Sequence, residues 1–278
     1  MSMSVHTNKS ALVALQNLNK TNDELDQVQG RINTGLAVNN AADNAAVWAI
    51  AQGQRADIGA LNSVKMSLDR ARSVAEVSAT AGETVSDLLV QIKERVVAAL
   101  DTSIDTSART AIDSDFKSLL RQITQVVQNA NFDGANLLDG SLPGNLKFLA
   151  NADANAFITL SKQTLSLGGS IITVAATASL GTITFATSIL AQLTTSISLT
   201  NQALGNLGSQ QKQIDGHAKF VSKLTDVLTT GVGNLVDADL AKESARLQAL
   251  QVQQQLGAQA LSIANSAPQI ILSLFRGG

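Results

Sequence analysis

Residues 61–99 read LNSVKMSLDRARSVAEVSATAGETVSDLLVQIKERVVAA and contain no proline. Apolar or small side chains recur in this run at alternating intervals of three and four, which places them on one stripe of a helix. A single helix of this length would extend roughly 58 Å at 1.5 Å per residue. The sequence therefore predicts one long, near-continuous helix in a rod-like bundle. The stripe consists of Leu61, Val64, Leu68, Ala71, Ala75, Ser78, Gly82, Val85, Leu89, Ile92, Val96 and Ala99.

Three other segments keep the same rhythm, at residues 15–32, 112–130 and 190–228, and a fifth stripe at residues 240–275 is weakened by Gln254, Gly257 and Pro268. A stripe sustained over several heptads is typical of helix-on-helix packing of the coiled-coil type. Aromatic residues make up only 3% of the chain, so the core must consist of aliphatic side chains from closely packed helices. The predicted fold class is mainly α, with long coiled-coil-type helices, and the helix of residues 61–99 is expected to pack along that of residues 190–228.

Two breaks lie at mirror positions along the chain. Residues 33–35 (Asn-Thr-Gly) read as a helix stop, and residues 231–234 (Gly-Val-Gly-Asn) interrupt the pattern before the last helix. This symmetry indicates that the two ends of the chain pair with each other. We predict an inner domain of paired terminal helices, residues 1–43 plus 235–278, and an outer helical-bundle domain, residues 44–234.

The middle of the chain changes character at about residues 131–187. Turn signals at residues 131–134, 138–140 and 142–144 alternate there with short apolar or β-branched runs. The sequence therefore predicts a small region of β-hairpins inside the outer domain. Residues 163–211 carry no charge, but Thr, Ser, Gly and Asn interrupt them throughout, so we predict no membrane insertion.

The chain offers little chemistry. It has no cysteine and only two histidines, His6 and His217, far apart and outside any metal-ligand spacing. The net charge of −2 does not favour a nucleic-acid partner. Paired acids such as Asp113 with Asp115, and Asp237 with Asp239, are typical of helix ends rather than of acid–base catalysis. We expect no catalytic, cofactor-binding or metal-binding residues, and hence no enzyme.

Short motifs lie at both ends of the chain, among them the Arg-Ile-Asn-Thr-Gly run that ends at Gly35. The N-terminal motifs are residues 15–22, 28–35, 40–46, 49–51 and 131–134, and the C-terminal motifs are residues 237–243, 254–265 and 271–276. Together these motifs resemble those of bacterial flagellins, and the resemblance covers about half of the chain, in order.

The resemblance implies a structural subunit of the flagellar filament used for swimming motility. It implies export, unfolded, through a type III pathway to the extracellular flagellum, and an inner domain that lines the filament channel. The partners that it implies are further copies of the chain, the flagellar cap and hook-filament junction proteins, an export chaperone and the type III export apparatus. The N-terminus lacks the apolar run of a cleaved secretory signal, which fits such a route. The short middle predicts a compact form without large variable outer domains.

Apolar side chains on the terminal helices exceed what two helices alone can bury. We therefore predict that they form the polymerisation interface. The predicted residues are Leu12, Leu15, Leu18, Leu25, Ile32, Leu247, Leu250, Leu256, Leu261, Ile271, Leu274 and Phe275.

A second site of interest is a degenerate receptor-recognition stretch. Many flagellins carry Arg-Val-Arg-Glu-Leu there, through which an animal Toll-like receptor recognises them. The equivalent residues here are Gln91, Ile92, Lys93, Glu94 and Arg95, so the leading Arg and the final Leu are both replaced.

Three alternatives stay open on the sequence. A hook-filament junction protein, also called hook-associated, would share the terminal helices but differ more in its middle. A surface polysaccharide-binding flagellin homologue would need exposed aromatic residues on strands, where only Phe148, Phe157 and Phe185 are available. An enzyme is disfavoured by the lack of catalytic groups.

Overall fold

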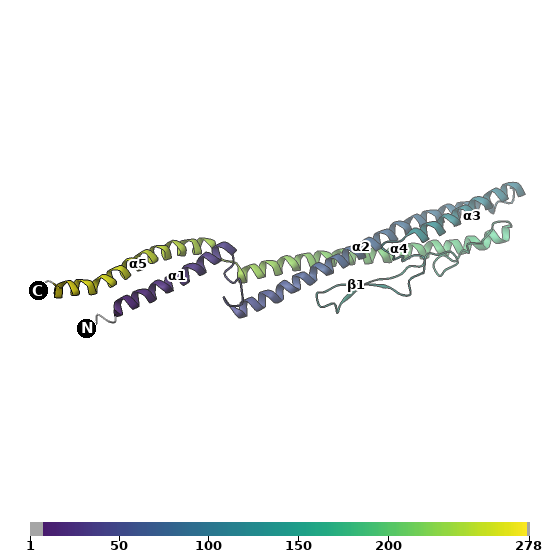
Figure 1. Cartoon of the computed structure of the whole chain (residues 1–278). Coiled ribbons are helices and arrows are strands. Elements are labelled where there is room, and N and C mark those ends of the chain that lie inside the picture. Colours follow the sequence, from purple (N-terminus) through teal and green to yellow (C-terminus); the bar gives the residue numbers. More distant parts are fainter. Residues whose placement is uncertain (1–7, 277–278) are drawn as a thin grey trace. The chain divides into compact units, whose positions relative to one another are not determined.

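The computed structural model describes the backbone of residues 8–276 and the side chains of residues 8–266 (Figure 1). The fold is mainly α, as predicted. The contacts within the chain divide it into two compact units, Met1–Ala56 with Val227–Gly278, and Asp57–Asp226. The elements in chain order are α1 (Lys9–Thr34), α2 (Ala45–Ala99), α3 (Thr106–Asn129), β1 (Leu146–Leu149), β2 (Phe157–Leu160), α4 (Ile183–Val236) and α5 (Leu240–Arg276).

Helices α2 and α4 pack antiparallel in the unit Asp57–Asp226. Arg72 forms an ion pair with Asp215 at 3.4 Å, and farther along α2 the Ser86 hydroxyl donates to Asn201 at 3.2 Å. Every position of the predicted stripe from Leu61 to Ala99 is buried. The prediction of one continuous helix packed along a second long helix is therefore confirmed.

Helix α3 follows α2 as a helical hairpin, and its buried stripe differs from the predicted one in phase. Phe116 and Ile123 are buried as expected, but Leu120 and Val127 are buried in place of Leu119 and Val126, which are half-buried. Both phases alternate threes and fours and both are apolar in this sequence. The sequence pattern alone therefore could not decide between them.

One hairpin lies against α2 and α4. Strands β1 and β2 pair antiparallel with Leu146 opposite Leu160. The Leu149 amide donates to the Ser67 hydroxyl of α2 at 3.1 Å. The Ser161 amide donates to the Gln210 side chain of α4 at 3.0 Å. These bonds satisfy edge groups of a sheet that is too small to be stable alone.

The predicted hairpin region extends too far along the chain. In the described part of the chain, the two-stranded sheet is the only one, and residues 171–182 form turns and bends. Helix α4 already begins at Ile183, and the Ala186 amide donates to Thr182 O at 3.1 Å. The β-branched run that suggested a strand is therefore partly the first turn of α4, where packing overrides propensity.

The predicted break at residues 231–234 is wrong, because α4 continues to Val236. Interior glycines cost a helix about 1 kcal/mol each, and α4 tolerates both. A Cβ on Gly233 would lie 2.7 Å from Oδ2 of Asp237, so this glycine accommodates a close neighbour, whereas a Cβ on Gly231 would make only ordinary contact with the Gln54 side chain at 3.8 Å. The boundary of the contact units thus falls within α2 and α4.

Helix α4 is also long and apolar enough, by length and composition, to cross a membrane. Among the described residues it is the one helix that passes this test, and 28% of its most apolar window is buried. The buried polar residues Ser196 and Thr200 lie on this helix. Ser196 is bonded there, since it accepts from the Thr173 amide at 3.0 Å.

Candidate assembly interface on the terminal helices

Local signals set the ends of both terminal helices. Asn8 caps α1 by accepting from the Ala11 amide at 3.1 Å, and Gly35 ends it with φ 71° and a bond from its amide to Arg31 O at 2.9 Å. Asp239 caps α5 by accepting from the Lys242 amide at 3.1 Å. Between them, Leu36 forms an antiparallel bridge with Asp237. The two linkers are thus bonded to each other beside the helix ends.

Helices α1 and α5 pack side by side and antiparallel (Figure 1, purple and yellow). Their shared core is small. Leu25, Val28 and Leu250 are buried, and Ile32 and Leu247 pack partly buried against them. Since full burial of such a side chain contributes about 1.5–3 kcal/mol, this core stabilises the pair only modestly against the cost of ordering two long helices.

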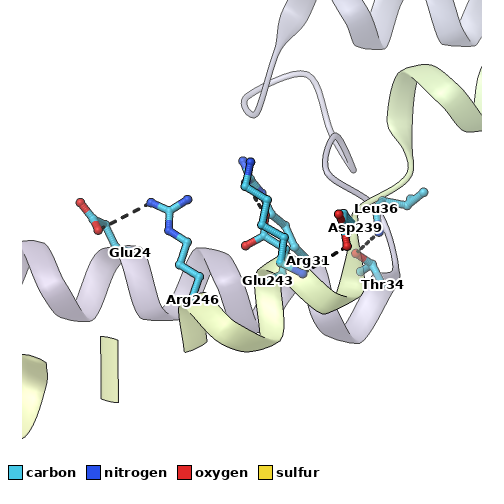
Figure 2. A network of polar contacts seen from close by, with 8 residues as sticks. Glu24, Arg31, Thr34, Leu36, Asp239, Glu243 and Arg246 are labelled. Carbon is cyan, nitrogen blue, oxygen red and sulfur yellow. Dashed lines mark hydrogen bonds and ion pairs between the residues drawn. The ribbon is translucent and has the colours of Figure 1, made fainter. Parts of the chain in front are cut away.

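Polar side chains form the rest of the contact between the two helices. Arg31 pairs with Glu243 at 3.0 Å, and Arg246 approaches Glu24 at 3.7 Å (Figure 2). Gln254 donates to the Asn22 side chain at 2.8 Å. Near the far end of the pair, the Asn8 side chain donates to Ala264 O at 2.6 Å. Apolar and polar layers therefore alternate along the contact.

A second apolar stripe on α5 faces away from α1. Val252, Leu256 and Ile263 are spaced by four and seven, which places them on one face of the helix. That face lies about 200° around the helix from the buried Leu250, given 3.6 residues per turn. These side chains are 55%, 58% and 70% exposed. No described part of the chain covers this face.

The predicted interface residues divide into three groups. Leu12, Leu15 and Leu256 are exposed, as a surface for another subunit requires. Leu18, Ile32, Leu247 and Leu261 are half-buried in the pair. Leu25 and Leu250 are buried in the core of the pair.

Ile271, Leu274 and Phe275 lie outside the residues whose side chains are described. Val13, Val252 and Ile263 are also exposed on the same helices. Sequence reasoning noted Val13 and Val252 among the apolar residues spread around the terminal helices but missed Ile263, which the second stripe on α5, offset from the first, could have identified.

The receptor-recognition stretch lies on α2. Ile92 is fully buried, and Gln91, Lys93, Glu94 and Arg95 are exposed. The two replaced positions, Gln91 and Arg95, are therefore both on the surface, where a binding partner would meet them.

The titratable group Asp113 has a structural role. No cluster of three or more metal-ligating side chains occurs among the residues that the structure describes. Asp113 accepts bonds from Ser179 and from the Leu180 amide, and pairs with Lys117. Burial alone would raise the pKa of Asp113, but these hydrogen bonds and the Lys117 charge outweigh it and lower the pKa below its ordinary value.

Long helices with paired ends and an uncovered apolar face are typical of helical structural proteins. Comparison with known proteins identifies which one. The N-terminal helical region of bacterial flagellin matches residues 5–142, and the C-terminal helical region of bacterial flagellin matches residues 188–275. The chain belongs to the bacterial flagellin family, and it is a structural subunit of the flagellar filament that serves motility.

Individual relatives agree with this assignment. The chain is 56% identical to flagellin FljJ of Caulobacter vibrioides over 281 residues, with all of both chains covered. It is 50% identical to flagellin FljM of the same bacterium, covering 98% of each chain. It is 38% identical to a flagellin of Brucella melitensis, covering 99% of each chain. The compact form that the sequence predicted is thus shared by full-length relatives, and the alternatives of a junction protein or a polysaccharide-binding homologue are not favoured.

A solved structure shares the fold. The crystal structure of Bacillus cereus flagellin has a TM-score of 0.50 and 18% sequence identity, and the match covers 56% of this chain and 88% of that one. The mainly helical architecture is therefore the one seen in a flagellin.

Proposed function

We propose that subunits join in the filament through the outward faces of α1 and α5. The observation that carries this proposal is the uncovered stripe of Val252, Leu256 and Ile263 on α5. Each of these three side chains is more than half exposed. Burying all three would contribute about 3–6 kcal/mol per subunit. Contacts of this kind repeat at every subunit of an open helical polymer. Small losses at one contact are therefore multiplied along the filament.

The paired terminal helices would then form an inner domain, with residues 1–43 and 235–278 inside and residues 44–234 outside. The thin core of the α1·α5 pair supports this assignment, because such a pair gains much of its order from neighbours. Leu12 and Leu15 would add to the contact from α1. Ile271, Leu274 and Phe275 would extend it at the end of the chain.

A single charge tests the interface. Leu256→Asp would place a carboxylate in the contact, which costs several kcal/mol when no partner is present. We expect loss of pelleting filaments and an unchanged helical circular dichroism signal. The matched control is Gln253→Asp, which adds the same charge at an exposed polar position of α5. Normal filaments from Leu256→Asp would refute the proposed interface.

The subunit is further proposed to leave the cell through the type III export apparatus with an export chaperone, and to meet cap and hook-filament junction proteins. Its role would be structural and without catalysis. Family membership supports these partners. Secretion of the chain in cells that lack the export apparatus would contradict the proposed route.

A further inference from the structure

Apolar contacts alone distinguish only weakly between registers of α1 against α5. In the observed pairing, Leu25 meets Leu250 and Leu18 meets Gly257. A slip of one heptad would bring Leu25 opposite Gly257 and Leu18 opposite Ala264, which are both small residues. The buried Val28 would then lie opposite Gln254, so part of the hydrophobic contact would be lost and part would survive the slip.

The polar layers do distinguish the registers. After that slip Arg31 would lie opposite Leu250, and after the reverse slip Glu243 would lie opposite Glu24. Either slip separates the charges of Arg31 and Glu243, and Glu243 is only 8% exposed. Asn22, bonded to Gln254 in the observed register, would face Leu261 or Leu247 instead. An unpaired buried charge is strongly unfavourable.

The Arg31–Glu243 pair is poorly arranged to add stability. One bond joins the two side chains, at 3.0 Å, while Arg31 Nε and Glu243 Oε2 are buried without a hydrogen-bond partner among the described residues. A buried pair that leaves a donor and an acceptor unsatisfied returns little of its desolvation cost. A polar group at a coiled-coil seam can instead specify register at a cost in stability.

We propose that Arg31–Glu243 and Asn22–Gln254 are the positioning residues that select the register of α1 against α5. The two pairs add little stability to the native register. In a slipped register their polar groups would lose their partners, and this loss destabilises the slipped register by more. The consequence for assembly rests on the proposed inner role of the terminal helices. If α1 and α5 pair in a single register, the exposed stripe of Val252, Leu256 and Ile263 occupies the same position in every subunit. A helical polymer requires such identical contacts.

Disulfide trapping reads the register directly, because the chain has no cysteine of its own. A Cβ on Gly257 would lie 3.8 Å from the Cβ of Leu18, the separation that a disulfide favours. Leu18→Cys/Gly257→Cys therefore reports the native register. Leu18→Cys/Ala264→Cys reports the slip of one heptad. Intrachain bonds are distinguished from bonds between chains by mobility on denaturing gels.

Four backgrounds of the full chain are compared after mild oxidation. With the seam unchanged, we expect the native crosslink only. With Arg31→Met/Glu243→Leu and Asn22→Leu/Gln254→Leu, we expect the ratio of native to slipped crosslink to fall by about tenfold or more, with helical content kept. The charge swap Arg31→Glu/Glu243→Arg should retain the native crosslink. The matched control, Glu24→Gln/Arg246→Gln, removes an exposed pair and should change nothing.

Two outcomes of the crosslinking experiment would contradict the proposal. A native crosslink that persists alone in the apolar background overturns the proposal, and would assign the register to the backbone bridge between Leu36 and Asp237. A native crosslink that fails to form with the seam unchanged overturns the pairing itself. Pelleting of the same variants reports the assembly role separately, so failure of the proposed interface is distinguishable from failure of the register.

Discussion

Asp113 on α3 fastens the segment that precedes α4. One carboxylate oxygen accepts from the Leu180 amide at 2.6 Å and from the Ser179 hydroxyl at 2.9 Å, and the other pairs with Lys117 at 2.6 Å. Leu180 is fully buried. Asp113→Ala would leave a buried amide without its acceptor. We expect this change to loosen the start of α4.

The expected loss follows from the bonds. Hydrogen bonds to a charged group contribute about 1.5–3 kcal/mol each, and a buried donor left unmade costs about 1–3 kcal/mol. The ion pair adds little, because the Lys117 side chain is 43% exposed. Asp113→Ala should therefore lower the free energy of unfolding by about 2–4 kcal/mol. Lys117→Ala should lower it by about 0–1 kcal/mol.

The same carboxyl makes stability depend on pH. Its pKa is lowered in the folded chain from the ordinary value of 3.8. A lowered folded pKa means that the contribution is fully present above pH 3.8 and is lost as pH falls through the folded pKa. The difference in unfolding free energy between the parent chain and Asp113→Ala should therefore shrink in acid.

Urea unfolding of the depolymerised full chain, followed by circular dichroism, measures both effects. The matched control is Asp115→Ala, which removes an exposed carboxylate two positions away on the same helix. We expect that variant to stay within about 0.5 kcal/mol of the parent. An Asp113→Ala chain as stable as Asp115→Ala at neutral pH would refute the reasoning.

Three other predictions concern the long helices and the surface. Val85→Pro, at a fully buried seam position of α2, should cost about 3 kcal/mol or more, and an unchanged thermal melt would contradict the seam. Toll-like receptor signalling should be weak, since Gln91 and Arg95 are exposed in place of Arg and Leu and an amide cannot reproduce the bonds of a guanidinium; a reporter response as strong as that of a flagellin with the intact stretch would contradict this. Deletion of residues 270–275 should leave a folded chain that does not pellet, and pelleting filaments would contradict the role given to that end.

The buried stripe of α2 was predictable because the spacing of its apolar residues and its helix propensity favour the same structure. Apolar and small residues keep the heptad from Leu61 to Ala99 without a proline, so the buried face has only one solution. On α3 the pattern admitted two phases, and contacts with α2 decided between them. A sequence pattern fixes a stripe only when the competing stripe is polar.

The middle of the chain was harder for a physical reason. The residues from Ile171 to Phe185 are β-branched and apolar, which favours a strand. Asp113, far away in sequence, instead bonds Ser179 and Leu180 and allows α4 to begin at Ile183. A long-range hydrogen bond of this kind leaves no local signal.

The glycines near the end of α4 were misread for a similar reason. Gly231 and Gly233 suggest a break by propensity alone. In the structure both lie inside α4, and Gly233 accommodates the close approach of Asp237. The burial of Leu25 and Leu250 within the pair was not predictable, because sequence cannot tell which of two apolar stripes a helix buries within its own chain.

The outward faces of the terminal helices carry the central claim, and a cryo-electron microscopy structure of the assembled filament tests it most directly. The quantity to measure is the exposed fraction of Val252, Leu256 and Ile263, which are 55%, 58% and 70% exposed in the single chain. We predict that all three are buried against a neighbouring subunit in the filament. If they remained as exposed there as they are in the single chain, the proposed interface would be wrong.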